Sequence, residues 1–166
     1  ALVSQFTGAN ENEKANFAAS QVLSITLISS IILGIIGSLF IPLLINILTN
    51  VKELTTVANS YLRVISLGFP FMFINSVFRS IMISYGDTLT PMYVTIFTNI
   101  INIFLDPLLI FGIGPFPKMG IIGAAVATIF SMFIASMFAI YFLTSGKKGI
   151  HVRTKYLKPE INWIKK

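Results

Sequence analysis

The feature that most constrains this chain is a series of long apolar stretches with almost no charge inside them. No charged residue lies between Lys14 and Lys52, for example. A helix needs about 20 apolar residues to cross the hydrocarbon core of a bilayer. Four stretches reach that length, and we predict membrane-spanning helices over residues 22–48, 61–85, 91–112 and 121–143.

Composition agrees with a membrane location. Of the 166 residues, 55% are hydrophobic and 11% are charged, whereas a soluble domain carries about 25% charged residues. The sequence therefore predicts an all-α fold: a polytopic transmembrane helical bundle with about four spanning helices. We expect a single, partial membrane domain over residues 1–166. The first residue is not Met, and we interpret the chain as an internal piece of a longer protein.

Positive charge collects in a basic tail over residues 145–166. Its basic residues are Lys147, Lys148, Arg153, Lys155, Lys158, Lys165 and Lys166. Because basic loops stay on the cytoplasmic side of a membrane, we predict a multi-pass protein of the cell membrane with a cytoplasmic tail. The tail could also be interpreted as a nucleic-acid patch, but a membrane flank explains it, so we expect no nucleic-acid partner. His151 lies in this tail and is expected to be solvated.

Two further patterns predict how the helices bend and pack. Pro70 should kink the second span, because it removes the hydrogen bond to the carbonyl of Ser66. Small residues that recur every four positions allow another helix to approach closely. Such rows are Ser30, Gly34 and Ser38 in the first span, and Gly123, Ala127, Ser131, Ala135 and Ala139 in the fourth.

One acidic residue, Asp106, lies inside a hydrophobic span. A carboxylate at membrane depth costs about 2.5–3.5 kcal/mol and usually faces a cavity or a partner. On a helical wheel, Thr95, Asn99, Asn102 and Asp106 fall within an arc of about 60°. Pro107 follows directly; it frees the carbonyl of Ile103 and should kink the helix beside the carboxylate. This combination is typical of a cation or proton site in a membrane protein.

Each of these polar residues also has a simpler interpretation. Asn99, Asn102 and Asp106 could only join helices through buried hydrogen bonds. Arg79, four residues after Asn75, could reach lipid headgroups, which we favour, or take a gating role. The sequence has no Gly-rich phosphate loop, no metal-spaced His/Glu cluster and no Ser/His/Asp set. We therefore expect no enzyme, no cofactor and no metal beyond a possible Na⁺.

Several segments resemble the multidrug and toxic compound extrusion (MATE) family of transporters. The fourth helix of that family resembles residues 61–70, YLRVISLGFP. Its following turn and fifth helix resemble Gly86-Asp87-Thr88, Thr90-Pro91 and the stretch from Asn102 through DPLLIFG. Its sixth helix begins like residues 120–128, GIIGAAVAT, and its second ends like residues 1–5, ALVSQ, with Gly8-Ala9.

The resemblance implies a transporter of twelve helices in two six-helix lobes, which exports cationic or amphipathic compounds in exchange for Na⁺ or H⁺. This chain would supply the third to sixth helices of the N-terminal lobe. The first and second helices and the C-terminal lobe would be missing partners. The resemblance assigns the cation site to Asp106 and Asn102, with Thr128 as a candidate hydroxyl, and Asn99 joins them through the polar row.

We therefore expect a fragment of a cation-coupled multidrug efflux antiporter that works by alternating access in the lipid bilayer. One alternative is a lipid or lipid-linked saccharide flippase of the same superfamily. The absence of Lys or Arg in mid-membrane counts against it. The other is a four-helix scaffold subunit without transport of its own, which would leave the intramembrane Asp-Pro pair unexplained.

Overall fold

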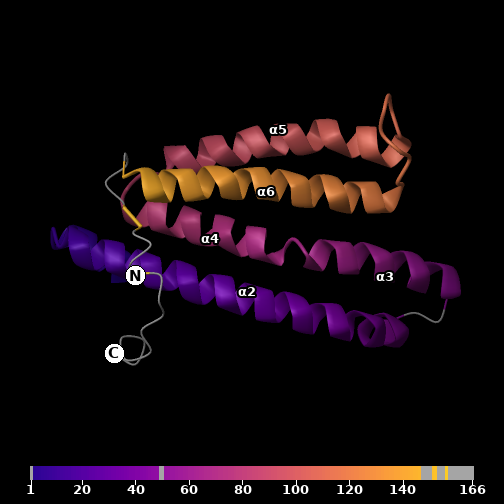
Figure 1. Ribbon diagram of the computed structural model, residues 1–166, viewed down its shortest axis with the longest axis horizontal. Coiled ribbons are helices and arrows are strands. Elements are labelled where there is room, and N and C mark those ends of the chain that lie inside the picture. The colour runs from indigo at the N-terminus through magenta and orange to yellow at the C-terminus, as the bar shows by residue number, and fades with distance from the viewer. Residues whose placement is uncertain (1, 49–50, 147–150, 153–155, 157–166) are drawn as a thin grey trace.

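The chain folds into a bundle of long helices. The structure, a computed structural model, describes residues 2–48, 51–146, 151–152 and 156, and within these residues it contains no strand. The helices are α1 (Leu2–Gly8), α2 (Asn12–Leu48), α3 (Lys52–Ser66), α4 (Phe69–Ser84), α5 (Leu89–Phe111) and α6 (Ile121–Ser145). Figure 1 shows α2, the α3–α4 pair, α5 and α6 lying side by side, with connections at both ends of the bundle. The predicted all-α transmembrane bundle is confirmed.

The helices do not begin where the apolar stretches begin. Helix α2 starts at Asn12, ten residues before the predicted span, and its first turns bury Ala15, Ala18 and Ala19. Helix α5 starts at Leu89, two residues before the predicted Pro91. The reason is that hydropathy marks the part of a helix that suits lipid, whereas the helix itself continues as long as its backbone bonds and packing hold.

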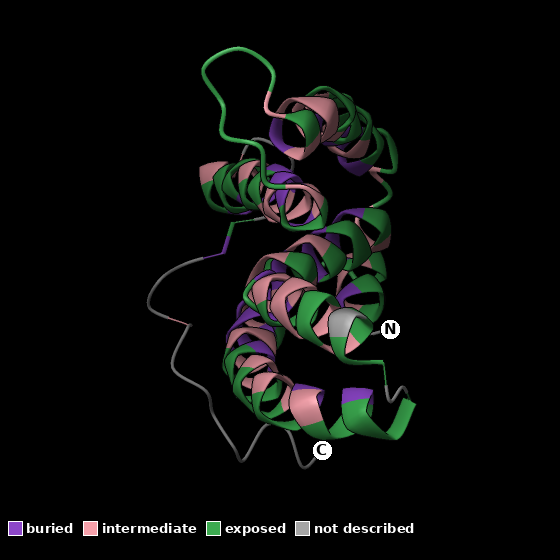
Figure 2. Ribbon diagram, turned by 90° about the vertical axis from the view of Figure 1, so that its right-hand side faces the viewer, coloured by how far each residue is buried: buried purple, intermediate pink, exposed green. Residues whose placement is uncertain are grey.

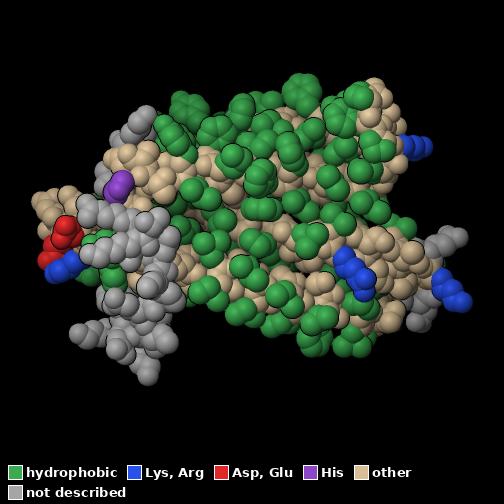
Figure 3. All heavy atoms as spheres, viewed as in Figure 1, with side chains coloured by type: hydrophobic (Ala, Val, Ile, Leu, Met, Phe, Trp, Pro, Cys, Tyr) green, Lys and Arg blue, Asp and Glu red, His purple; other side chains and the backbone are tan. Residues whose placement is uncertain are grey.

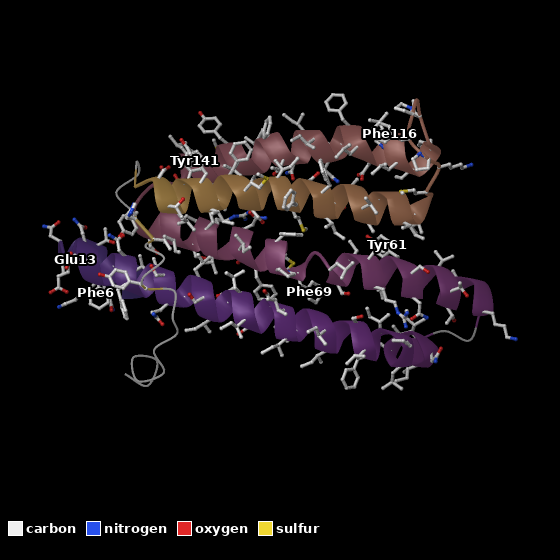
Figure 4. The ribbon with its side chains drawn as sticks, viewed as in Figure 1. Phe6, Glu13, Tyr61, Phe69, Phe116 and Tyr141 are labelled. Atoms are coloured by element: carbon white, nitrogen blue, oxygen red, sulfur yellow. The ribbon has the colours of Figure 1, made fainter. Side chains whose placement is uncertain are left out.

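The predicted second span is two helices rather than one kinked helix. Helices α3 and α4 are separated at residues 67–68 and are bent by 47°. Pro70 lies in the first turn of α4, where proline is tolerated because the first N–H groups of a helix have no partner inside it. Phe69 marks the break in Figure 4. Pro107, by contrast, lies within the continuous helix α5, and its kink remains a prediction.

The break between α3 and α4 is packed tightly on both sides. A Cβ atom placed on Gly34 of α2 would lie 3.3 Å from the carbonyl oxygen of Ser66. A Cβ atom on Gly68 would lie 3.0 Å from Cγ1 of Ile129 in α6. A larger residue at Gly34 or Gly68 would therefore force α2 or α6 away from the break.

Helix α6 lies between α5 and the α3–α4 pair and packs against all three helices (Figure 1). Its predicted row of small residues is confirmed as a packing face: Gly123, Ala127, Ser131, Ala135 and Ala139 are all buried. The closest approach is at Gly123, where a Cβ atom would lie 2.6 Å from the carbonyl carbon and oxygen of Leu109 in α5. Figure 2 shows the buried residues between the helices and the exposed ones on their outer sides.

The outside of the bundle is apolar. On the second half of α2, Leu39, Ile47 and Leu48 are 72%, 74% and 82% exposed. Figure 3 shows hydrophobic side chains over the middle of the visible face, with most charged side chains toward the ends. A belt of this kind suits contact with lipid or with other apolar helices.

One end of the bundle gathers three separate segments around Asn16. Its Oδ1 atom accepts a hydrogen bond from the Tyr85 hydroxyl at 3.3 Å and one from the backbone N–H of His151 at 3.0 Å. The Val152 N–H donates to the carbonyl of Leu143 at 2.8 Å. Glu13 and Tyr141 lie toward this end in Figure 4, and Phe116 lies at the other. His151 is exposed, as predicted.

The predicted orientation in the membrane rests on the basic residues of the tail. Every basic residue of the predicted tail falls outside the described residues. The cytoplasmic location of the tail therefore remains a prediction, although the start of α2, the end of α4 and the described tail residues share one end of the bundle.

Candidate functional site

A polar cavity of about 380 Å³ lies between α4, α5 and α6. Its apolar lining residues are Met72, Phe78, Pro91, Val94, Met132 and Ala135. Its polar lining residues are Asn75, Ser76, Arg79, Ser80, Thr95, Thr98, Asn99, Asn102, Thr128 and Ser131. Apolar walls with a set of converging polar groups are typical of small-molecule sites, and the volume falls within their usual range.

The predicted polar row of α5 forms one wall of this cavity. Thr95, Asn99 and Asn102 line it, but Asp106 is not among the lining residues. Asp106 is half-buried, and its Oδ1 accepts a hydrogen bond of 3.3 Å from Nδ2 of Asn102. Two members of the predicted polar row are thus in direct contact. Asn102 connects the cavity to the carboxylate one turn further along the helix.

Thr128 faces the same cavity from α6. Its Oγ1 atom donates to the carbonyl of Ala124 at 2.9 Å, so the oxygen keeps its lone pairs for another donor or a cation. The structure therefore brings Asn99, Asn102 and Thr128 to one cavity. Their part in binding an ion, and that of Asp106, remains a prediction.

Asn75 and Ser131 are two further polar residues of the cavity that the sequence analysis did not include in the site. Nδ2 of Asn75 donates to the carbonyl of Met132 at 3.0 Å and so joins α4 to α6. Asn75 Oδ1 and Ser131 Oγ are both buried without a hydrogen-bond partner among the described residues. A buried polar atom left unpaired costs about 1–3 kcal/mol, so these two atoms need a partner in the cavity, which water or a ligand can supply.

Arg79 also lines the cavity, from α4. Its Nη2 atom lies 3.5 Å from Oγ1 of Thr95 in α5, and its side chain is exposed. The sequence analysis favoured contact with lipid headgroups for this residue. The structure places Arg79 beside the cavity and next to Thr95 of α5. Contact with lipid headgroups alone would not explain this position.

The described residues contain no cluster of three or more His, Cys, Asp or Glu side chains. A cation at this site would therefore depend on a single carboxylate, with amide, hydroxyl and main-chain oxygens as its other ligands. Oxygen donors of these kinds suit a hard cation. On α5, the side chains of Asp106 and Asn102 are in contact, and the Ile103 carbonyl has no N–H partner at Pro107; their use as cation ligands remains a prediction.

A bundle of apolar helices with a polar cavity and an intramembrane carboxylate defines a multi-pass membrane protein of the transporter class. A model of the MatE family matches residues 1–108, and the chain belongs to this family, the multidrug and toxic compound extrusion transporters. The predicted resemblance is thus confirmed. Members of the family are transporters rather than enzymes.

Relatives of the chain have names that refer to transport or drug resistance. The chain is 31% identical over 146 residues to a probable multidrug resistance protein, YoeA, of Bacillus subtilis, covering 88% of the chain and 32% of the relative. It is 45% identical over 119 residues to a probable multidrug resistance protein NorM of Thermotoga maritima, covering 68% and 25%. It is 35% identical over 136 residues to an FAD transporter of Shewanella oneidensis, covering 82% and 30%.

The fold agrees with solved structures of the family. A multidrug resistance MATE family transporter in an inward-facing conformation matches with a TM-score of 0.88 and 27% identity, over 99% of this chain and 37% of that one. The chain therefore spans about a quarter to a third of the length of the curated relatives described above.

Proposed function

We propose that this chain is part of the N-terminal lobe of an efflux antiporter that exports small cationic or amphipathic compounds in exchange for Na⁺ or H⁺. The carrying observation is the cavity between α4, α5 and α6, one wall of which is hydrogen-bonded to an intramembrane carboxylate. The lipid bilayer and the remaining helices of the transporter would cover the exposed apolar surface. No cofactor is needed, because the energy would come from the ion gradient.

Asp106 is the proposed ion-binding residue. Its Oδ1 is held by Asn102 at 3.3 Å, and Oδ2 can take a proton or join in holding Na⁺. Thr128 and Asn99 on the cavity wall are the proposed supporting residues. Either ion would cancel the negative charge of Asp106, which is costly in a low-dielectric environment.

Asn102 provides a physical route from ion to substrate. It lines the cavity and also donates to Asp106. When Asp106 gains a proton or Na⁺, it becomes a weaker acceptor for the Asn102 amide, and that amide is free to change its position in the cavity wall. The ion and the amphipathic compound would then compete for the lobe, or displace one another through the conformation of α5. This exchange is the alternating-access cycle proposed here.

The test is Asp106→Asn in the full-length transporter that carries this segment. The variant keeps the shape of the side chain but removes the charge, so we expect loss of drug resistance with normal amounts of protein in the membrane. The matched control is Glu13→Gln, which removes a carboxylate at the exposed start of α2 and should leave resistance unchanged. Resistance at the wild-type level in Asp106→Asn would refute the assignment.

The two alternatives receive less support. The relatives described as multidrug resistance proteins favour export of small compounds over the flippase. The polar cavity inside the bundle is unexplained if the chain is only a scaffold.

A further inference from the structure

The tail that follows α6 returns to the start of α2. The chain turns at Gly146, the C-cap of α6, whose φ of +69° suits glycine. The backbone N–H of His151 then donates to Oδ1 of Asn16 at 3.0 Å, although the two residues are 135 positions apart. We call the described residues His151, Val152 and Tyr156 the tail anchor, because each of them contacts the helix bundle.

Val152 is the apolar part of the tail anchor. It is 4% exposed and belongs to the hydrophobic core, together with residues of α1, α2, α4 and α6. Its N–H donates to the carbonyl of Leu143, near the end of α6, at 2.8 Å. Because burial of an aliphatic side chain is favourable, the core itself holds the tail at this end of the bundle.

Gln21 of α2 holds the tail anchor at a second point. Its side chain is fully buried, and its Nε2 atom donates to the main-chain carbonyl of Tyr156 at 2.8 Å. A buried amide is stable only where its polar atoms have partners, and the tail supplies one of them. The Tyr156 ring packs edge-on against Phe17, with the ring centroids 5.4 Å apart. Phe17 and Gln21 are four residues apart and so share one face of α2.

The contacts of the tail anchor do not use the positive charge that the sequence analysis emphasised. They are main-chain hydrogen bonds at His151, Val152 and Tyr156, together with apolar packing. A basic flank acts on the membrane surface through its Lys and Arg side chains and needs no attachment of this kind. The tail therefore has a second role besides its charge.

Building on the proposed transport function, we infer that the tail anchor is a clasp that fastens the following part of the transporter to α2. The chain beyond Tyr156 is thereby tethered to Asn16 and Gln21, as well as to α6, from which it comes. Asn16 also accepts a hydrogen bond from the hydroxyl of Tyr85, at the end of α4. The clasp stays closed during transport, so that these ends of α2, α4 and α6 move as one unit.

The experiment measures how often the clasp opens. It uses Val152→Cys in the full-length transporter, with any other cysteines replaced, in lipid vesicles. A buried cysteine reacts with N-ethylmaleimide only while the tail is detached, so its labelling rate reports the open fraction. We expect this cysteine to react at least tenfold more slowly than His151→Cys, at an exposed position. Gln21→Leu removes the donor to Tyr156 and should make the labelling of Val152→Cys about tenfold faster.

Ser24→Ala is the matched control. Ser24 is also a buried polar residue of α2, but its hydroxyl donates to the Ser20 carbonyl in its own helix, at 2.9 Å. This variant should leave the labelling rate unchanged. Asn16→Ala removes the acceptor of the His151 N–H and should also speed labelling, so it provides the same test if Gln21→Leu does not reach the membrane.

Labelling during transport tests whether the clasp stays closed. With a Na⁺ or H⁺ gradient and ethidium, an amphipathic cation, the rate at Val152→Cys should remain within twofold of its resting value. A larger rise would show that the clasp opens in the transport cycle and would overturn the inference. Equal rates at Val152→Cys and His151→Cys, or no effect of Gln21→Leu, would overturn it as well. Because the resting rates need no transport, a wild type that exports nothing would count against the proposed function alone.

Discussion

At the scale of single residues, the sequence predicts some polar residues of the cavity and does not predict others. The row of Thr95, Asn99, Asn102 and Asp106 could be predicted, because its members share one face of a helix that is otherwise apolar. Ser131 could not, because it occupies a row of small residues whose evident role is packing. Its unpaired oxygen becomes apparent only when the helices that surround it are in place.

The contact between α5 and α6 gives a prediction at a single glycine. Replacing Gly123 with Ala places a Cβ atom 2.6 Å from the Leu109 carbonyl, so the two helices must separate. We expect a loss of stability of about 1–3 kcal/mol, measured as a lower midpoint of thermal unfolding of the full-length transporter in detergent. Gly8→Ala is the control, because no atom lies within 4 Å of its new Cβ; an equal loss in both variants would contradict the close approach.

At the scale of the elements, three helices are long and apolar enough to cross a bilayer, and the bent α3–α4 pair would make a fourth span, whereas four single spans were predicted. Apolar length predicts how many times a chain crosses a bilayer, since the thickness of the hydrocarbon core is fixed. It does not tell a kinked helix from a broken one. Pro70 indicates the place of the bend, whereas the separation of α3 from α4 also depends on Gly34 and Ile129, which belong to other helices.

The break itself can be tested by a graded series at Gly34. Ala at this position would bring Cβ to 3.3 Å from the Ser66 carbonyl oxygen, and Val would add two methyl groups in the same space. We expect the unfolding midpoint to fall in the order wild type, Gly34→Ala, Gly34→Val, with a cost of about 1–3 kcal/mol for Val. Gly37→Ala should differ little from wild type, because its Cβ would meet Phe69 at an ordinary 3.5 Å. A Val variant as stable as the wild type would show that α2 does not constrain the break.

At the scale of the whole molecule, the start of α2 and the described residue His151 lie at the same end of the bundle, and this predicts which loops share a side of the membrane. This segment contains no cysteine, so single cysteines can be introduced into it as probes once any cysteines elsewhere in the transporter have been replaced. Cysteine at the exposed positions Glu13 and Thr88 should react with a membrane-impermeant maleimide only from the cytoplasmic side, and cysteine at Lys118 only from the outside. The same labelling pattern at Thr88 and Lys118 would contradict the arrangement of α5 as a crossing.

The hydrogen bonds to Asn16 have a consequence for how such a protein can be assembled. The Asn16 side chain is reached both by Tyr85, between the second and third crossings, and by His151, after the last. The chain from α2 to the tail therefore crosses the bilayer an even number of times and returns to the side on which α2 began. A helix joined after this segment would enter the bilayer from that same side.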